Sequence, residues 1–362
     1  MPRRRRVECD PLLSSDGHDC QAERGRVAEA RAAAEVPKIS VMMDVTNGEQ
    51  YLDAALASLA RQTFADFEIV LCAHGVTEET ARIIHDWQVR EPRLRVWWSN
   101  RLPLAQAHNV AARLARAPLL ARMDADDIAL PHRLERQYRM FVEHPELSFA
   151  GGGAEVIDSR GCRLTTIRNP TDHRSIRNAL LRGSPIIHST LMVRTEAFWA
   201  VGGYRRGLNL AEDFDLHSRL VEAHRAGNCP DPLVQYRLHS RSLSSSKALR
   251  LAIATLSTNV ASLARRSGAK EPFVGGVPSL RIAERALGLT RDEVRQQLQA
   301  AAWRASFSRR LLTAPVPRRL KTGLRRTALA LGLHPLYASI FRLIPYMGRF
   351  RRSRTPAQPH RH

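Results

Sequence analysis

The chain lacks the features that would assign it to several common protein classes. Only five cysteines occur among its 362 residues, and none of them stands in a CxxC or Cys/His ligand spacing. We therefore expect neither a disulfide framework nor a structural zinc site. No clean run of about 18 apolar residues is present, which argues against an ordinary transmembrane helix. The arginine run at residues 3–6 is followed by charged sequence instead of an apolar stretch, so a cytoplasmic protein without a signal peptide is the default expectation.

Acidic residues are scarce in the last third of the chain. Residues 245–362 contain 23 Lys and Arg but only 4 Asp and Glu, whereas residues 37–244 contain 26 and 24. Almost all of the formal charge of +21 therefore belongs to the C-terminal region. An anionic partner, if there is one, would be met by that region and not by the body of the protein.

Strand-like apolar segments alternate with helical patterns in the part of the chain that follows a mixed-charge tail, residues 1–36. The predicted strands are 39–44, 67–72, 94–98 and 119–123, and the predicted helices between them are 49–61, 77–90 and 104–115. This alternation indicates βαβ units and a parallel sheet. A helix is predicted at 131–143, and a less regular half begins with 149–158. In it a strand is predicted at 187–193, a helix at 211–225 and a last strand at 233–238. Beyond residue 244 the pattern is helical, at 246–267 and 279–312, so we expect an α/β domain at 37–244 and a basic helical region at 245–362.

Three carboxylates follow the last strand of the alternating half. Asp124, Asp126 and Asp127 lie just past an apolar segment, and ligands of open α/β sheets bind at the carboxyl ends of strands. Like charges this close require a compensating cation, and hard oxygen ligands suit Mg²⁺ or Mn²⁺ holding a substrate phosphate. A solvated acidic turn that caps the next helix is the alternative.

Two further clusters occur downstream in a fixed order. The segment AEDFDLHSRL (211–220) places three carboxylates at a helix start, and YRLHSRSLS (236–244) places His239 after a strand. With these segments and ARMDADDIALPHRLERQ (121–137), residues 37–244 resemble family 2 glycosyltransferases of the GT-A fold. The resemblance implies a Rossmann-like mixed sheet flanked by helices, a nucleotide-sugar donor and an inverting reaction.

The resemblance also implies roles for particular residues. Asp126 would coordinate a divalent cation, Mn²⁺ or Mg²⁺, with Asp124 contacting the metal or the donor ribose and His239 supplying another ligand. Asp213 would be the general base that takes a proton from the acceptor hydroxyl. The other positions that the resemblance places at the donor are Asn47, Ala73 and Asn109, and Asp127, Glu212, Gly202 and Gly203 would support the site. An ordinary helix residue is the alternative for Asn109, and a plain turn for the two glycines.

The chain departs from the family pattern where the nucleobase and ribose are normally held. Asp44 and Thr46 replace Pro and Tyr of the usual Pro-Val-Tyr-Asn, and Ala73 and His74 replace an acidic pair. The nucleotide of the donor is therefore left open. A degenerate, non-catalytic domain that binds a membrane surface is the alternative reading of the whole chain.

The basic C-terminal region carries an apolar stretch, 328–347, between arginine clusters. Pro335, His334 and Arg342 interrupt it, so a segment at 315–354 lying on an anionic membrane surface is favoured over a span. Packing on the catalytic domain or on a dimer partner is the alternative. Nucleic-acid binding is disfavoured because the aromatic residues do not interleave with the arginines. The sequence predicts a metal-dependent inverting glycosyltransferase acting on a saccharide or lipid-linked acceptor at the inner face of a bacterial membrane.

Overall fold

The computed structural model describes residues 36–180, 184–208 and 211–239, together with Thr258, Ala261, Ser262, Arg265 and Arg266. The chain divides into Met1–Val36 and Pro37–His362, and the structure below belongs to the second unit. The expected tail at 1–36 and membrane segment at 315–354 lie outside the described residues, as does the helix expected at 279–312.

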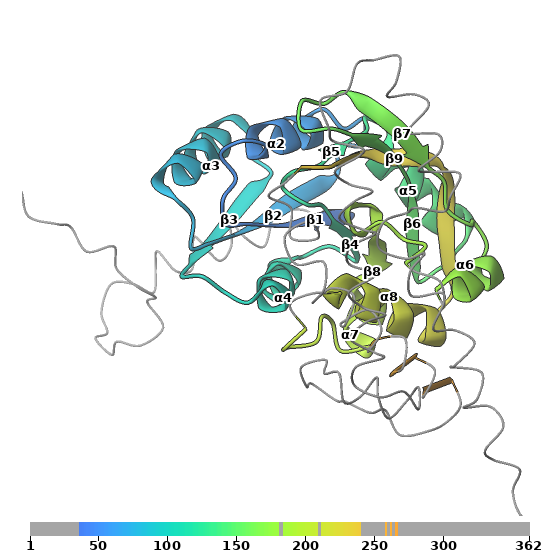
Figure 1. Ribbon diagram of the computed structural model, residues 1–362. Helices are drawn as coiled ribbons and strands as arrows, with labels where there is room; N and C mark the ends of the chain where they lie inside the picture. Colours follow the sequence, from blue (N-terminus) through green and yellow to red (C-terminus); the bar gives the residue numbers. More distant parts are fainter. Residues whose placement is uncertain are drawn as a thin grey trace, which may run out of the picture. The chain divides into compact units, whose positions relative to one another are not determined.

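The first half forms a parallel sheet with helices between its strands, as expected. The strands are β1 (Ile39–Val45), β2 (Phe67–His74), β3 (Leu94–Ser99) and β4 (Leu119–Arg122), and the helices are α2 (Leu52–Ala60), α3 (Glu78–Arg90) and α4 (Leu104–Leu114). β1 pairs in parallel with both β2 and β4, and β2 pairs with β3 (Figure 1). The carboxyl ends of β1 and β4 therefore lie side by side, which places Asp44 near the acidic loop after Arg122.

The second half extends the same sheet with antiparallel and parallel strands. It contains β5 (Ile128–Ala129), β6 (Phe149–Ile157), β7 (Arg163–Ile167), β8 (Met192–Arg194) and β9 (Ala226–Arg237). Its helices are α5 (Arg133–Glu143), α6 (His173–Ala179), α7 (Thr195–Ala200) and α8 (Glu212–Ala223), with a 3₁₀ turn, η1 (His188–Thr190). The strand order is β3-β2-β1-β4-β8-β6-β9-β5, with β7 beside β6. This is a mixed sheet, and it matches the predicted GT-A architecture.

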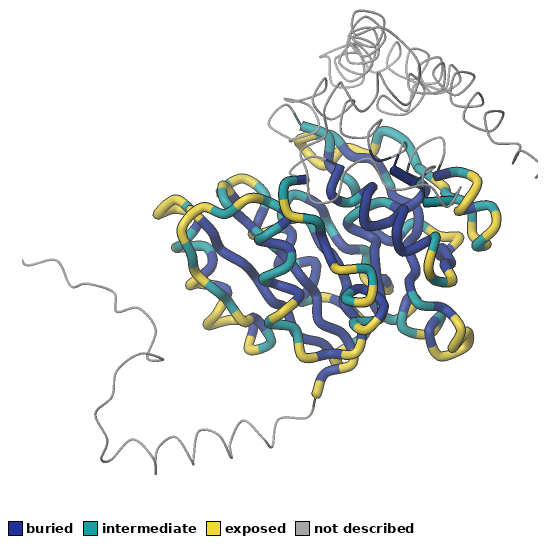
Figure 2. Tube along the Cα trace, turned by 90° about the horizontal axis from the view of Figure 1, so that it is seen from below, coloured by how far each residue is buried: buried dark blue, intermediate teal, exposed yellow. Residues whose placement is uncertain are grey.

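Two apolar clusters cover the two faces of the sheet. Side chains of β1 alternate between them: Val41 and Met43 pack with α2, α3 and α5, whereas Met42 packs with α4, α6, α7 and α8. Figure 2 shows the strands as the buried centre of the domain. The helical and strand spacing of the apolar residues predicted which side chains are buried, because each apolar side chain must reach one of the two layers.

The segment 187–193 was expected to be a continuous strand, and this is wrong. Residues 188–190 form η1, and only Met192–Arg194 pairs in the sheet. The Thr190 hydroxyl donates to the Ile187 carbonyl at 2.7 Å, so the side chain satisfies backbone that a strand would pair. The turn moves His188 and Ser189 out of the sheet and toward the carboxylates.

A helical stripe from the C-terminal region packs on α8. The five described residues between 258 and 266 are helical and share one helix face by their spacing. Arg265 Nε lies 2.5 Å from Glu222 Oε2, and the Ser262 hydroxyl donates to Glu222 at 2.5 Å. Ala261 is buried against Leu208, in the loop before α8. For these residues, packing on the catalytic domain is what the structure shows.

Candidate active site

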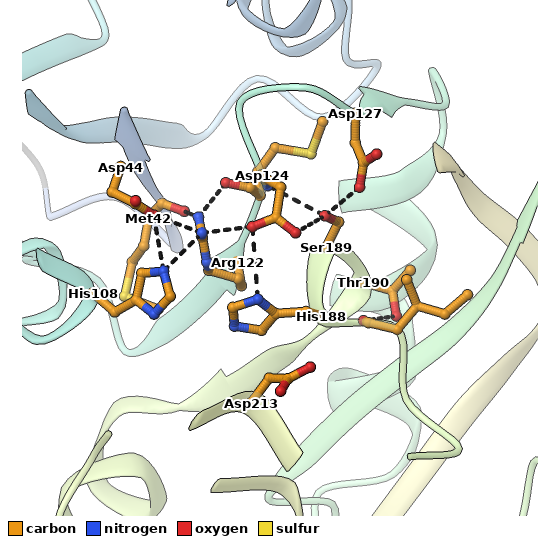
Figure 3. A network of polar contacts seen from close by, with 12 residues as sticks. Met42, Asp44, His108, Arg122, Asp124, Asp127, His188, Ser189, Thr190 and Asp213 are labelled. Carbon is orange, nitrogen blue, oxygen red and sulfur yellow. Dashed lines mark hydrogen bonds and ion pairs between the residues drawn. The ribbon is translucent and has the colours of Figure 1, made fainter. Parts of the chain in front are cut away.

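A buried arginine neutralises the carboxylates at the carboxyl ends of β1 and β4. Arg122 Nη2 lies 2.6 Å from Asp44 Oδ1 and 2.6 Å from Asp124 Oδ1 (Figure 3). His108 Nε2 lies 2.9 Å from the same oxygen of Asp44. Burial acts to raise the pKa of Asp44, but His108 and Arg122 hold that pKa well below its ordinary value. The protein itself therefore supplies part of the positive charge that the acidic loop requires.

The side chain of Ser189 joins two of the predicted carboxylates. Its Oγ lies 2.8 Å from Asp124 Oδ2 and 2.5 Å from Asp127 Oδ2. Asp127 is 1% exposed and also accepts a hydrogen bond from the Arg237 backbone N–H at 2.8 Å. Burial and the neighbouring Asp126 and Asp124 raise the pKa of Asp127 well above its ordinary value. Asp127 therefore ties the acidic loop to η1 and β9 instead of facing substrate.

Asp126 is the most exposed carboxylate of the acidic loop, and it contacts His239 at the C-terminal end of the domain. Asp126 Oδ2 lies 2.8 Å from His239 Nε2, and their side chains are 35% and 12% exposed. The Arg237 guanidinium lies over the Tyr51 ring at 4.5 Å and donates through Nε to the Asp126 carbonyl at 2.9 Å. Two residues that are 113 positions apart are thus held at one place, as the sequence predicted.

The ligand atoms of Asp126 and His239 suit a divalent cation that also binds the phosphate of a substrate. Within the described ranges no group of three or more His, Cys, Asp or Glu side chains has the arrangement of a self-contained metal centre. Mg²⁺ and Mn²⁺ in nucleotide sites use one or two carboxylates, with water and phosphate oxygens completing the shell. Asp126 with His239 matches that pattern, whereas both oxygens of Asp124 already accept from Arg122 and Ser189.

Asp213 lies in the first turn of α8, on the other side of His188 from Asp124 (Figure 3). Its Oδ1 accepts from the Phe214 backbone N–H at 2.7 Å. Burial raises the pKa of Asp213 to about 6. Its neighbour Glu212 is 6% exposed, and Oε2 of Glu212 has no hydrogen-bond partner among the described residues. Burial and the Asp213 charge raise the pKa of Glu212 well above its ordinary value.

The loop before α8 is held by Asn109. The Asn109 amide donates to the Tyr204 carbonyl at 2.7 Å and its oxygen accepts from the Tyr204 N–H at 2.9 Å. Gly203 has φ +61°, and a Cβ there would lie 2.8 Å from Asn109 Oδ1, so this close approach requires glycine. Gly202 also has positive φ (+83°), but a Cβ there would meet nothing within 4 Å. Contact of Asn109 or either glycine with a donor remains a prediction.

The remaining predicted donor residues lie at the ends of β1 and β2. Ala73 is fully buried, backbone included, whereas Asn47 is exposed, and contact of either residue with a nucleotide remains a prediction. His74 Nδ1 accepts from the Leu102 backbone N–H at 3.1 Å, and its Nε2 lies 3.4 Å from Thr46 Oγ1. Two of the residues that depart from the family pattern, Thr46 and His74, therefore contact each other.

Sequence reasoning did not identify four residues that build the site: Arg122, His188, Ser189 and Tyr204. Tyr204 and His188 are joined by a contact of 2.8 Å between hydroxyl and Nε2. The signal for Arg122 was available, because three adjacent carboxylates need a cation and an arginine precedes them. Nothing in the local sequence separates His188 from an ordinary buried residue.

Comparisons with known proteins agree with this geometry. Residues 40–202 match the model of the family described as glycosyl transferase family 2. The O-antigen biosynthesis glycosyltransferase WbnJ of Escherichia coli is 31% identical over 208 residues, which cover 56% of this chain and 81% of that protein. The amylovoran biosynthesis glycosyltransferase AmsE of Erwinia amylovora is 30% identical, over 56% and 76%.

Solved structures share the fold. The structure of S. aureus TarS 1-349 in complex with UDP-GlcNAc has a TM-score of 0.54 at 18% identity, covering 87% of this chain and 91% of that one. The mannosyltransferase PcManGT from Pyrobaculum calidifontis, in complex with GDP-Man and Mn²⁺, has a TM-score of 0.50 at 18% identity, covering 87% and 86%. The mixed sheet, the acidic loop at 124–127, the acidic first turn of α8 and these relatives all agree. The chain belongs to glycosyl transferase family 2 and is a glycosyltransferase of the GT-A fold.

Proposed function

We propose that this glycosyltransferase is metal-dependent and inverting, and that it moves a sugar from a nucleotide-sugar donor to a saccharide or lipid-linked acceptor in bacterial cell-envelope or exopolysaccharide synthesis. The observation that carries the proposal is the placement of two different carboxylates: partly exposed Asp126 beside His239, and Asp213 with a pKa of about 6 on the other side of His188. The relatives WbnJ and AmsE are named for O-antigen and amylovoran biosynthesis, which supports a role in polysaccharide synthesis.

Asp126 and His239 would hold the cation, and Asp124, bonded to Arg122 and Ser189, would face the donor. A bound Mg²⁺ or Mn²⁺ supplies positive charge to the departing nucleoside diphosphate. This role suits an exposed carboxylate better than a buried one, because the cation must also reach substrate phosphate.

Asp213 acts as the general base. With a pKa near 6 its carboxylate is largely ionised at neutral pH and still close enough to the working pH to accept a proton efficiently. It takes the proton of the acceptor hydroxyl while that oxygen forms its bond to the anomeric carbon. The bond from this carbon to the donor phosphate oxygen breaks on the opposite face, so the configuration inverts.

A donor panel with two variants tests the proposal. Purified protein with Mn²⁺ should release nucleoside diphosphate from some nucleotide sugar, and Asp126→Ala and Asp213→Asn should each reduce this at least about 10²-fold. Asp213→Asn should keep the Mn²⁺-dependent thermal shift with nucleotide, whereas Asp126→Ala should lose it. The matched control is Asp86→Asn, an exposed position on α3. Absence of both turnover and metal-dependent nucleotide binding across the panel would contradict the proposal.

We also propose that the enzyme works at a membrane surface through residues 315–354. The support is the composition of this segment, in which arginines flank an apolar stretch. Among the residues that the structure describes, no helix is long and apolar enough to cross a membrane.

A further inference from the structure

The turn formed by His188, Ser189 and Thr190 connects the donor side of the site to the acceptor side. Ser189 contacts Asp124 and Asp127 of the acidic loop. Thr190 Oγ1 accepts from the Gly152 N–H of β6 at 3.0 Å and so fixes the turn to the sheet. The remaining residue, His188, reaches toward the acidic loop and toward the loop that contains Tyr204.

The imidazole of His188 has a defined partner at each nitrogen. Nε2 lies 2.8 Å from the Tyr204 hydroxyl, and Nδ1 lies 3.6 Å from Asp124 Oδ1. We assign the hydrogen to Nδ1 because that nitrogen faces a carboxylate. At 3.6 Å the contact with Asp124 is electrostatic and longer than a hydrogen bond, whereas Nε2 accepts from the Tyr204 hydroxyl at 2.8 Å. The ring also packs edge-on against His108, with centroids 5.2 Å apart.

Both partners of the ring are themselves fixed. Tyr204 is 1% exposed, and Asn109 bonds its backbone at both the N–H and the carbonyl. Asp124 accepts from Arg122 and Ser189. Arg219 of α8 donates to the Gly203 carbonyl at 2.8 Å, which ties the segment that contains Tyr204 to the helix whose first turn carries Asp213. In Figure 3 His188 lies between Asp124 and Asp213, and its side chain is 12% exposed.

We propose that His188 is a positioning residue for sugar transfer: it joins Asp124 to the loop before Asp213 through Tyr204, and so fixes the donor carboxylate relative to the general base. An inverting displacement needs the base and the leaving group on opposite faces of one carbon, so a shift of about 1 Å between the two sides lowers the rate about 10²-fold. A neutral amide or imidazole suits this place because a third carboxylate would repel both others. The inference rests on the proposed function.

Two isosteres separate the nitrogens of His188. Asn places its amide near the Nδ1 position and Gln near Nε2, so His188→Asn keeps a donor toward Asp124 and His188→Gln keeps a partner for Tyr204. Because a link fails when either end is lost, we expect His188→Gln and His188→Asn each to lower kcat about 10²-fold with donor KM within about twofold. Tyr204→Phe should lower kcat about tenfold. His85→Gln, at an exposed histidine on α3, is the control and should leave kcat unchanged.

Several results would overturn the inference. They are a kcat of either His188 variant within twofold of wild type, or a loss of kcat that only follows a lower Tm. If the His188 variants do not fold, Tyr204→Phe decides, and a wild-type kcat there would refute the link.

A readout without turnover separates this inference from the proposed function. In ¹⁵N-histidine NMR spectra of the whole protein, the resonances missing in His188→Asn identify the ring, and Tyr204→Phe should shift its Nε2 signal. An unchanged Nε2 signal counts against the link even in an active enzyme. An enzyme inactive on all donors that shows the shift counts against the proposed function alone.

Discussion

At the scale of single residues, each buried charge of the site depends on its partner. Arg122 and Asp44 have side chains 4% and 9% exposed, and each would be strongly destabilising without the other. Desolvation alone disfavours both ions, so their presence depends on the 2.6 Å contact and on the further bonds to Asp124 and His108.

Breaking this pair should therefore be costly. Arg122→Met leaves two buried carboxylates without their cation, and we expect the free energy of unfolding in urea to fall by about 3–5 kcal/mol. Arg139→Met, which removes an exposed i,i+4 pair with Glu135, is the control and should change it by less than about 0.5 kcal/mol. Equal, small effects of both substitutions would show that the buried pair is not a major contribution.

Asp213 should show opposite effects on activity and stability. Its pKa is raised from 3.8 to about 6, so below pH 6 the base is protonated and kcat should fall about tenfold per pH unit. A raised pKa in the folded state means that stability is lost as the pH rises from about 4 to 6. Asp213→Asn should therefore be more stable than wild type at pH 8, by up to about 3 kcal/mol, and equal to it near pH 3. Urea unfolding at both pH values checks this, and no gain at pH 8 would contradict it.

At the scale of elements, α8 begins from a strained residue. Ala211, its N-cap, has φ +61° and is the one non-glycine residue with positive φ within the described ranges. An L-residue with a Cβ pays about 1 kcal/mol or more for this conformation, which is common where a functional side chain must be aimed. This left-handed residue directly precedes the first turn of α8, which carries Asp213.

Relief of this strain is a direct test. Ala211→Gly should raise the free energy of unfolding by about 0.5–1 kcal/mol while kcat changes little, because the backbone conformation is kept. The same substitution at Ala57, inside α2, should lower it by about 1 kcal/mol. A destabilised Ala211→Gly variant would mean that glycine's unfolded-state entropy exceeds the strain.

The stripe at 258–266 is expected to stabilise α8 from outside. Glu222 is paired with Arg265 at 2.5 Å and with Arg266 at 3.5 Å, and the three side chains are 12–20% exposed. Glu222→Gln should lower the free energy of unfolding by about 1–3 kcal/mol and increase hydrogen exchange at 258–266. Glu196→Gln, exposed on α7, is the control. Unchanged exchange at 258–266 would show that the ion pairs do not hold the stripe.

At the scale of the whole molecule, the charge of the C-terminal region should determine where the enzyme binds. The full chain should bind vesicles containing anionic lipid and release at high salt, since each basic residue contributes about 1 kcal/mol near such a surface. Deletion of residues 315–362 should abolish this binding while kcat on a soluble acceptor remains. Equal binding to neutral vesicles, or preference for an oligonucleotide, would contradict the membrane assignment.

The local pattern of the sequence was sufficient for most elements and for the order of the acidic clusters. The four strands and four helices predicted between residues 39 and 143 lie within a few residues of their predicted bounds, because apolar period alone reports which face a side chain must bury. The short strand β5 was not predicted. The prediction of a strand at 187–193 is wrong because hydroxyl-to-backbone bonds at Thr190 compete with strand pairing. The spacing of apolar residues carries no information about such bonds.

The sequence by itself determined the sheet, its acidic loop and the motifs of a family 2 glycosyltransferase, since these depend on local spacing and residue type. The tertiary structure decided how the carboxylates differ. It buries Asp127, pairs Asp124 with Arg122, leaves Asp126 partly exposed beside His239 and raises the pKa of Asp213. Burial and charge partners come from elements far apart in the chain, so four similar residues become distinct only after folding.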